Sequence, residues 1–201
     1  ARAVLAAGRD ARPAAARKPK IRWHPIPFGA ERRKQMRAYA RRHYDLDRAR
    51  LLEPKVIVQH YTATATLESA FNTFAANEPD PELGEHPGVC THFIVDRDGT
   101  IHRLVRLKWM CRHTIGLNHT AFGIEHVGRS DAEVMGNRRQ LAASLRLTRW
   151  LQARHGIATA DVIGHAESLS SPHHLERVER LRDRTHEDFA PATMRRYRAR
   201  L

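Results

Sequence analysis

The sequence predicts an α/β protein in which a central mixed β-sheet is flanked by helices. Three observations support this prediction. Short β-branched runs alternate with longer segments of helical periodicity, in the order β-α-β-β-β-α-β. The pair Asp98-Gly99 separates two strand-like runs, as in a tight antiparallel hairpin. The 201 residues suffice for one well-buried domain, and hydrophobic residues make up 41% of them without any run of membrane-spanning length.

The expected elements follow one another along the chain. An amphipathic helix within residues 28–46 is indicated by Met36, Tyr39, Ala40 and Tyr44, which recur at helical spacing. The elements expected after it are a buried strand at 55–60, a helix from Thr66 as N-cap to Pro79, a hairpin within 91–107, a strand at 121–128, a long helix at 138–155 with Gly156 as C-cap, a strand at 160–165 and a short terminal helix within 186–201.

Composition divides the chain into three parts. Residues 1–22 are rich in Ala, Arg and Pro and lack periodicity, which predicts a flexible basic arm. Residues 23–54 form a helical extension, and residues 55–201 form the main domain with a C-terminal helix. The chain lacks both an initial Met and the apolar core of a signal peptide, which favours an upstream segment removed on export. We therefore expect an extracytoplasmic or secreted protein.

The charge balance favours polyanionic partners. Lys and Arg number 35 against 22 acidic residues, which gives a net charge of +13. Nucleic acid, anionic cell-wall polymers and membrane surfaces are candidates, and a coding bias toward Arg would produce the same charge. Zinc-finger spacing, RNP-like aromatic runs and basic heptads are all missing, and aromatic residues make up only 6%. We therefore expect no specific binding of nucleic acid.

Histidines stand at both ends of a polar loop. The stretch VIGHAESLSSPHH, residues 162–174, contains His165, His173 and His174, and His60 ends the strand expected at 55–60. If the strands that end at His60 and His165 are parallel neighbours, both imidazoles emerge at one edge of the sheet. A catalytic zinc takes three protein ligands and leaves one position open. These two histidines and one from 173–174 would supply them; the other interpretation is solvated loop histidines.

Four segments resemble, in this order, the zinc-dependent N-acetylmuramoyl-L-alanine amidases. The segments are VIVQHYTAT, THFIVDRDGTIHRLV, CRHTIGLNHTAFGIEHVG and VIGHAESLSSPHH. The family is known as amidase-2, and its fold is shared by the peptidoglycan recognition proteins. The resemblance runs from about Lys55 to about Leu175, so it identifies residues 55–201 as an amidase catalytic domain.

The resemblance implies a zinc ion held by His60, His165 and a third ligand about nine residues after the second. That position is His174, and its neighbour His173 is the rival. The catalytic glutamate of the family corresponds to Glu125. In some relatives a Tyr does this work instead, but that position is Thr91 here, so the proton transfer falls to Glu125.

Further positions follow from the resemblance. It places Tyr61, His113, Asn118 and His173 along the substrate cleft, with His113 also assigned to catalysis; their alternative interpretation is ordinary loop structure. Many relatives have a Lys two residues before the third ligand, which stabilises the oxyanion. Here that position is Pro172, so either His173 or His113 takes this role or the contribution is absent.

The implied reaction is zinc-dependent hydrolysis of the amide bond between N-acetylmuramic acid and L-alanine in peptidoglycan. Zinc would activate water and polarise the scissile carbonyl, and Glu125 would move the proton. The alternative is a non-catalytic peptidoglycan-binding module of the same fold. Loss of a ligand would mark such a module.

Two cysteines, Cys90 and Cys111, remain. Pairing about Asp98-Gly99 puts Cys90 opposite about Leu107, so Cys111 lies a short loop away. In an exported protein we expect these cysteines to form a disulfide.

Overall fold

The structure, a computed structural model, describes residues 16–80 and 83–201. A six-stranded sheet of order β1-β4-β3-β5-β2-β6 forms its centre. The strands are β1 (Ile21–Trp23), β2 (Val56–Tyr61), β3 (Phe93–Val95), β4 (Ile101–Arg103), β5 (Ala121–His126) and β6 (Val162–Gly164). The helices are α1 (Ala30–Tyr44), α2 (Leu67–Ala75), α3 (Asp131–Gly136), α4 (Arg138–His155) and α5 (Pro191–Arg198), with short 3-10 helices at Thr159–Asp161, His165–Ser170 and Glu179–Leu181.

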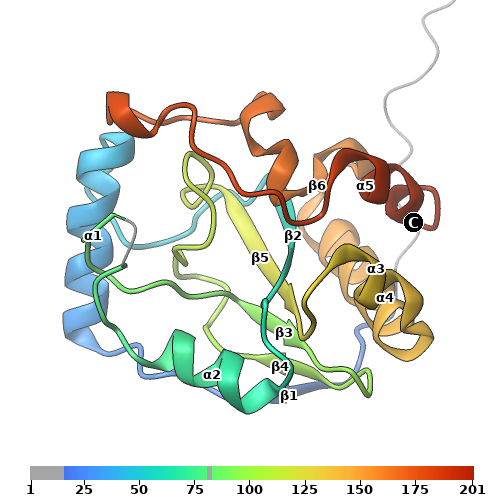
Figure 1. The fold of residues 1–201 in the computed structure, drawn as a ribbon. Helices are drawn as coiled ribbons and strands as arrows, with labels where there is room; N and C mark the ends of the chain where they lie inside the picture. Colours follow the sequence, from blue (N-terminus) through green and yellow to red (C-terminus); the bar gives the residue numbers. More distant parts are fainter. Residues whose placement is uncertain (1–15, 81–82) are drawn as a thin grey trace, which may run out of the picture.

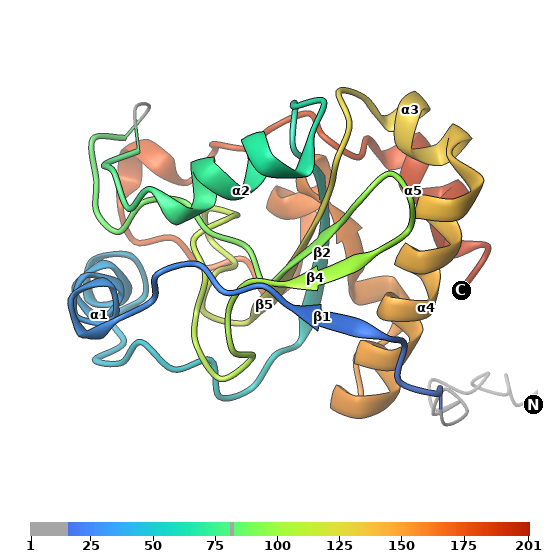
Figure 2. The ribbon, with the colours of Figure 1, turned by 90° about the horizontal axis from the view of Figure 1, so that it is seen from below.

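The helices cover the sheet on both sides. In Figure 1, α1 lies on the left and α3, α4 and α5 lie on the right, with the sheet between them. Figure 2 shows the same arrangement from below, with α2 above the strands and α4 beside them. The prediction of a mixed sheet flanked by helices is confirmed. None of the helices in the described part of the chain combines the length and apolar composition needed to span a bilayer.

Strand direction in the sheet is mixed. β3, β5, β2 and β6 run parallel, whereas β4 pairs antiparallel with β3 through the predicted hairpin. The turn needs Gly99, whose φ of 85° lies in the left-handed region that favours glycine. The side chain of Asp98 supports the turn, because its Oδ1 accepts a hydrogen bond from the Thr100 N–H at 2.7 Å.

Two of the predicted helices begin or end at the capping residue expected for them. Thr66 accepts a hydrogen bond from the Ser69 N–H at the start of α2, and Gly156 ends α4 in the left-handed conformation. Two elements were missed. β1 has three residues, too few to show periodicity. α3 has six, although Ser130 accepts from the Glu133 N–H at its start, so the Ser-x-x-Glu pattern was a usable indication.

The N-terminal segment belongs to the main domain. β1 pairs with β4 from Ile21 onward, so the predicted boundary between residues 22 and 23 falls inside a strand. Met36 and Tyr39 of α1 are fully buried in the same hydrophobic core as Phe93 of β3. Residues 1–15 of the expected basic arm lie outside the described residues.

The expected disulfide is not formed. Cys90 and Cys111 are both buried, free cysteines. The Cys90 sulfur accepts a hydrogen bond from the Arg112 N–H at 3.2 Å. Burial raises the pKa of the Cys111 thiol well above its usual value, and the hydrogen bond with Cys90 adds to the rise. The two side chains therefore act here as small, adjacent core residues.

Candidate functional site

His60 and His165 lie together at one edge of the sheet. β2 and β6 are parallel neighbours, as expected, with Gln59 opposite Gly164. His60 therefore stands near the carboxyl end of β2, and His165 directly follows β6 and begins a 3-10 helix. Both imidazoles are buried. Their rings meet edge to face, with centroids 4.7 Å apart.

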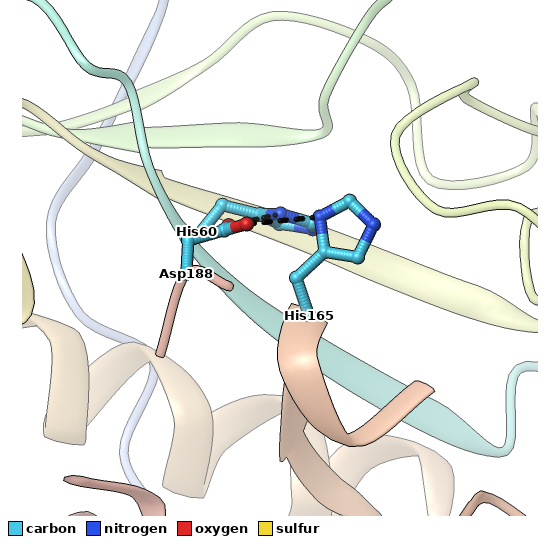
Figure 3. A group of neighbouring side chains, drawn as sticks. All are labelled: His60, His165 and Asp188. Carbon is cyan, nitrogen blue, oxygen red and sulfur yellow. Dashed lines mark hydrogen bonds and ion pairs between the residues drawn. The ribbon is translucent and has the colours of Figure 1, made fainter. Parts of the chain in front are cut away.

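Asp188 joins the two histidines from the segment that leads into α5. Its Oδ2 accepts a hydrogen bond from His60 Nδ1 at 2.9 Å, and its Oδ1 is 3.2 Å from His165 Nδ1 (Figure 3). One potential ligand atom from each residue lies within 4.8 Å of the others. Two imidazoles and one carboxylate are a donor set that zinc accepts, so these residues fit a zinc ion.

Neighbouring residues fix the position of Asp188. The carboxylate of Asp131, at the start of α3, accepts hydrogen bonds from the N–H groups of Phe189 and Ala190 at 2.8 and 2.9 Å. The chain then passes so close to β6 that a Cβ at position 164 would collide with the carbonyl oxygen of Phe189, which explains why Gly164 precedes His165. The Ala166 N–H also donates to the Asp188 carbonyl at 3.1 Å.

The structure corrects the placement expected for the third ligand. His174 packs against Gly116, away from the group formed by His60, His165 and Asp188. Its neighbour His173 lies 3.7 Å from Asp161, which precedes β6 and so marks the opposite end of that strand. After the 3-10 helix at His165–Ser170, the chain runs away from the site and comes back to it only near Asp188. In the group of converging side chains, Asp188 therefore stands where the nine-residue spacing predicts His174.

Glu125 faces the same site from β5. It is the register partner of His60, so both side chains project from one face of the sheet. Its carboxylate is buried, and Oε2 has no hydrogen-bond partner among the described residues. Burial raises the pKa of Glu125 to about 7; the charge of His60 opposes the rise and that of Asp188 adds to it. A carboxylate of this kind suits proton transfer near neutral pH.

Asp188 affects the two histidines differently. Burial lowers the pKa of His60, but the hydrogen bond to Asp188 and the charges of Glu125 and Asp188 reverse this, and the net pKa is raised. Burial dominates at His165 and lowers its pKa to about 4. Asp188 itself is held well below its usual pKa: burial opposes this, but the hydrogen bonds from both imidazoles outweigh burial.

His113 lies beside His60 on the loop that leads into β5. His113 Nδ1 is 3.2 Å from His60 Nε2, and the Thr114 hydroxyl lies within 3.3 Å of the same His60 nitrogen. Burial lowers the pKa of His113 well below its usual value, and His60 adds to the effect. Its Nε2 has no hydrogen-bond partner. Gly123 makes room for this ring, because a Cβ there would lie 2.8 Å from His113 Cδ2.

Asn118 supports this loop from within. It is fully buried, and its Oδ1 accepts hydrogen bonds from the N–H groups of His113 and Thr114, both at 2.8 Å. Its Nδ2 donates to the Tyr39 hydroxyl at 3.1 Å. Tyr61, another predicted substrate contact, is half-buried at the end of β2 and is therefore more accessible than Asn118.

His186 was missed by the sequence reasoning. It stacks on His165, with ring centroids 4.6 Å apart and planes inclined by 30°. His186, His113 and His165 all line a cavity of about 60 Å³. Once Asp188 replaces His174 in the group, His186 occupies the position two residues before the carboxylate, where sequence reasoning had placed Pro172.

A family model matches most of the chain. Residues 50–180 match the family model described as N-acetylmuramoyl-L-alanine amidase; the match includes His60, Glu125 and His165 and ends before Asp188. No curated protein sequence matches this chain significantly.

Solved structures are similar to this chain, and the first two named below share its fold. A mutant endolysin from Bacillus subtilis is 22% identical, with a TM-score of 0.51 over 90% of this chain and 97% of that one. The catalytic domain of XlyA is 19% identical, with a TM-score of 0.52 over 90% of this chain and 99% of that one. The endolysin amidase LysCS from Clostridium intestinale URNW is 27% identical, with a TM-score of 0.45 over 57% of this chain and 70% of that one.

Proposed function

This chain belongs to the N-acetylmuramoyl-L-alanine amidase family, and from that premise we propose that His60, His165 and Asp188 hold a catalytic zinc ion while Glu125 moves the proton. The reaction is hydrolysis of the amide bond between N-acetylmuramic acid and L-alanine in peptidoglycan. The observation that carries the proposal is the convergence of two imidazoles and a carboxylate beside a buried glutamate with a free oxygen.

Zinc in this site would supply a Lewis acid that activates water and polarises the scissile carbonyl. The proton transfer falls to the protein's own side chains. Glu125 accepts the proton of the attacking water on its unpartnered Oε2 and delivers it to the nitrogen of L-alanine as the C–N bond breaks. Water supplies the hydroxyl that remains on the lactyl carbonyl. The products are a lactyl carboxylate and a free amino terminus.

Residues around the cavity would orient the substrate. His113 and His186 flank it, and each offers an imidazole to the developing negative charge on the carbonyl oxygen. Without metal, Asp188 accepts a hydrogen bond from His60 Nδ1 and lies 3.2 Å from His165 Nδ1, so the three side chains already converge where the zinc ion would bind. Because the substrate is cell-wall peptidoglycan, the proposed site of action is extracytoplasmic.

Mass spectrometry of digested peptidoglycan tests this function. We expect free L-alanine amino termini on the released stem peptides, intact glycan, and loss of both products after chelation, with recovery when zinc is restored. Tight peptidoglycan binding without turnover by the zinc-loaded protein would instead assign it to a binding module of the same fold. Cleavage of glycan would contradict the proposal.

A further inference from the structure

A second cluster of basic side chains surrounds a cavity of about 140 Å³ at the opposite edge of the sheet. The lining residues are Arg48, Glu53, Lys55, His119, Thr120 and His173. Lys55 directly precedes β2 and Thr120 directly precedes β5, so the cavity lies at the amino ends of these strands. His60 stands five residues beyond Lys55 along β2, which is roughly 16 Å at the usual rise per residue. The cavity is therefore distinct from the zinc site.

Hydrogen bonds between the loops hold this cavity in shape. The Lys55 N–H donates to the Thr120 carbonyl at 2.8 Å, and the Thr120 hydroxyl donates to the Glu53 carbonyl at 2.9 Å. The ring of His119 packs against Tyr44 at the end of α1, with centroids 4.6 Å apart. These contacts place the basic groups on structured loops around one space.

Several donors in this cluster have no partner. Arg48 Nε and His119 Nδ1 are both buried without a hydrogen bond. Within the described part of the chain, neither Arg48 nor Lys55 forms an ion pair. Burial lowers the pKa of His119, and together with the charges of Arg48, His173, His174 and Lys55 it brings this pKa to about 4. Glu53 is the one carboxylate lining the cavity, so the space remains positive.

We propose that this cavity binds a phosphate group. Arg48 and Lys55 supply two permanent positive charges, and His119 and His173 supply further ring nitrogens from other sides. Donors distributed around the space match an anion with three or four oxygens better than a planar carboxylate. These side chains do not form a metal site, because the one converging group of metal-ligating residues in the described chain is at the other edge of the sheet.

Two sources supply this chemistry: free inorganic phosphate, and the phosphodiesters of an anionic cell-wall polymer. NMR titration with inorganic phosphate, at an ionic strength held constant with chloride, tests the site directly. We expect saturable shifts of the imidazole signals of His119 and His173. An oligomer of glycerol phosphate that competes for these shifts identifies the polymer as the source, whereas phosphate binding without competition identifies the free anion.

Matched variants separate a built site from the general attraction of a basic protein. The double variant Arg48→Ala/Lys55→Ala should bind phosphate at least about 10-fold more weakly, because each lost cation removes a charge-assisted hydrogen bond. Lys34→Ala/Arg138→Ala makes the same change in net charge at exposed positions and should bind as the unaltered protein does. Hydrolysis of a soluble muropeptide should be unchanged in both, which verifies the fold. Non-saturable shifts, or equal binding by both double variants, would overturn the proposal.

Discussion

At the scale of single residues, the chemistry depends on one isolated carboxylate. Glu125→Gln keeps the shape of the side chain but cannot accept a proton. We expect turnover of muropeptide to fall about 100- to 10,000-fold while zinc and substrate remain bound. Glu68→Gln, the same change at an exposed position of α2, should have no effect. Near-normal turnover by zinc-loaded Glu125→Gln would assign the proton transfer to another group, with His113 the next candidate.

The same carboxylate makes the stability of the metal-free protein depend on pH. Burial raises the pKa of Glu125 from 4.5 to about 7, so the folded state holds this proton more tightly than the unfolded state. The contribution is fully present below pH 4.5 and is lost as the pH rises through 7; a difference of this size corresponds to about 3 kcal/mol.

Glu125→Gln has no such proton to lose. Urea denaturation with a chelator present gives the free energy of unfolding of both proteins. The difference between the variant and the unaltered protein should shift in favour of the variant by about 3 kcal/mol between pH 4 and pH 8. His60 and Asp188 face the same carboxylate, and the charge of Glu125 also raises the pKa of His60, so the comparison reports the coupled titration of Glu125 and its neighbours. An equal difference at the two pH values would show that Glu125 does not carry this linkage.

Substitution of Asp188 and of His174 tests which of these residues is the third zinc ligand. Asp188→Ala removes the proposed carboxylate ligand of the zinc ion, together with its contacts to the rings of His60 and His165. We expect its zinc affinity to fall at least about 100-fold, measured by competition with a fluorescent chelator. His174→Ala should keep zinc, because that ring packs on Gly116 away from the group. The opposite result would restore the ligand that the nine-residue spacing indicates.

At the scale of elements, α1 supports the loop that carries His113. Asn118 connects the two, because it accepts from two N–H groups of the loop and donates to the Tyr39 hydroxyl. Tyr39 in turn stacks on His43, and His43 Nδ1 lies 2.9 Å from the Glu176 carboxylate. The position of His113 therefore depends on a helix outside the catalytic edge of the sheet.

Asn118→Ala tests this dependence. The substitution leaves two buried N–H groups without an acceptor, and we expect the free energy of unfolding to fall by about 3 kcal/mol. Asn72→Ala, on the exposed face of α2, should change it by less than about 0.5 kcal/mol. Urea denaturation of the two variants makes the comparison. Equal stability would mean that the loop finds other acceptors.

Elements with strong local patterns were predictable from the sequence, and long-range closures were not. β2 and β6 are short β-branched runs, and their parallel pairing brought His60 and His165 together as expected. Asp188 was not predicted as a ligand, because hydrophobic periodicity does not indicate how long a loop is. The chain after His165 makes a long excursion before it returns, so only the tertiary fold could identify Asp188. The Cys90–Cys111 prediction rightly placed two residues close together but could not decide their bonding.

At the scale of the whole molecule, the N-terminal segment and the predicted catalytic domain share one hydrophobic core. The sequence analysis separates residues 23–54 from residues 55–201, where the resemblance begins. The contacts of α1 favour a single folding unit instead. Arg32 is buried, and its guanidinium donates to the carbonyl oxygens of Phe74 and Val89 at 2.9 and 2.8 Å, which ties α1 to the segments on either side of residues 81–82.

A fragment of residues 55–201 should therefore fail to fold cooperatively. It lacks Met36, Tyr39 and Tyr44, three side chains buried in the common core. Burial of each contributes about 1.5–3 kcal/mol, and their sum approaches the 5–15 kcal/mol total stability that is typical of a domain. The fragment also lacks β1, so β4 would present an unpaired edge that promotes aggregation.

Near-UV circular dichroism and urea denaturation of the fragment should show no cooperative transition. A chain beginning at residue 16 keeps every contact described and should unfold cooperatively. If the fragment unfolds with a stability within about 2 kcal/mol of that control, the two segments are separate units and α1 is an appendage after all.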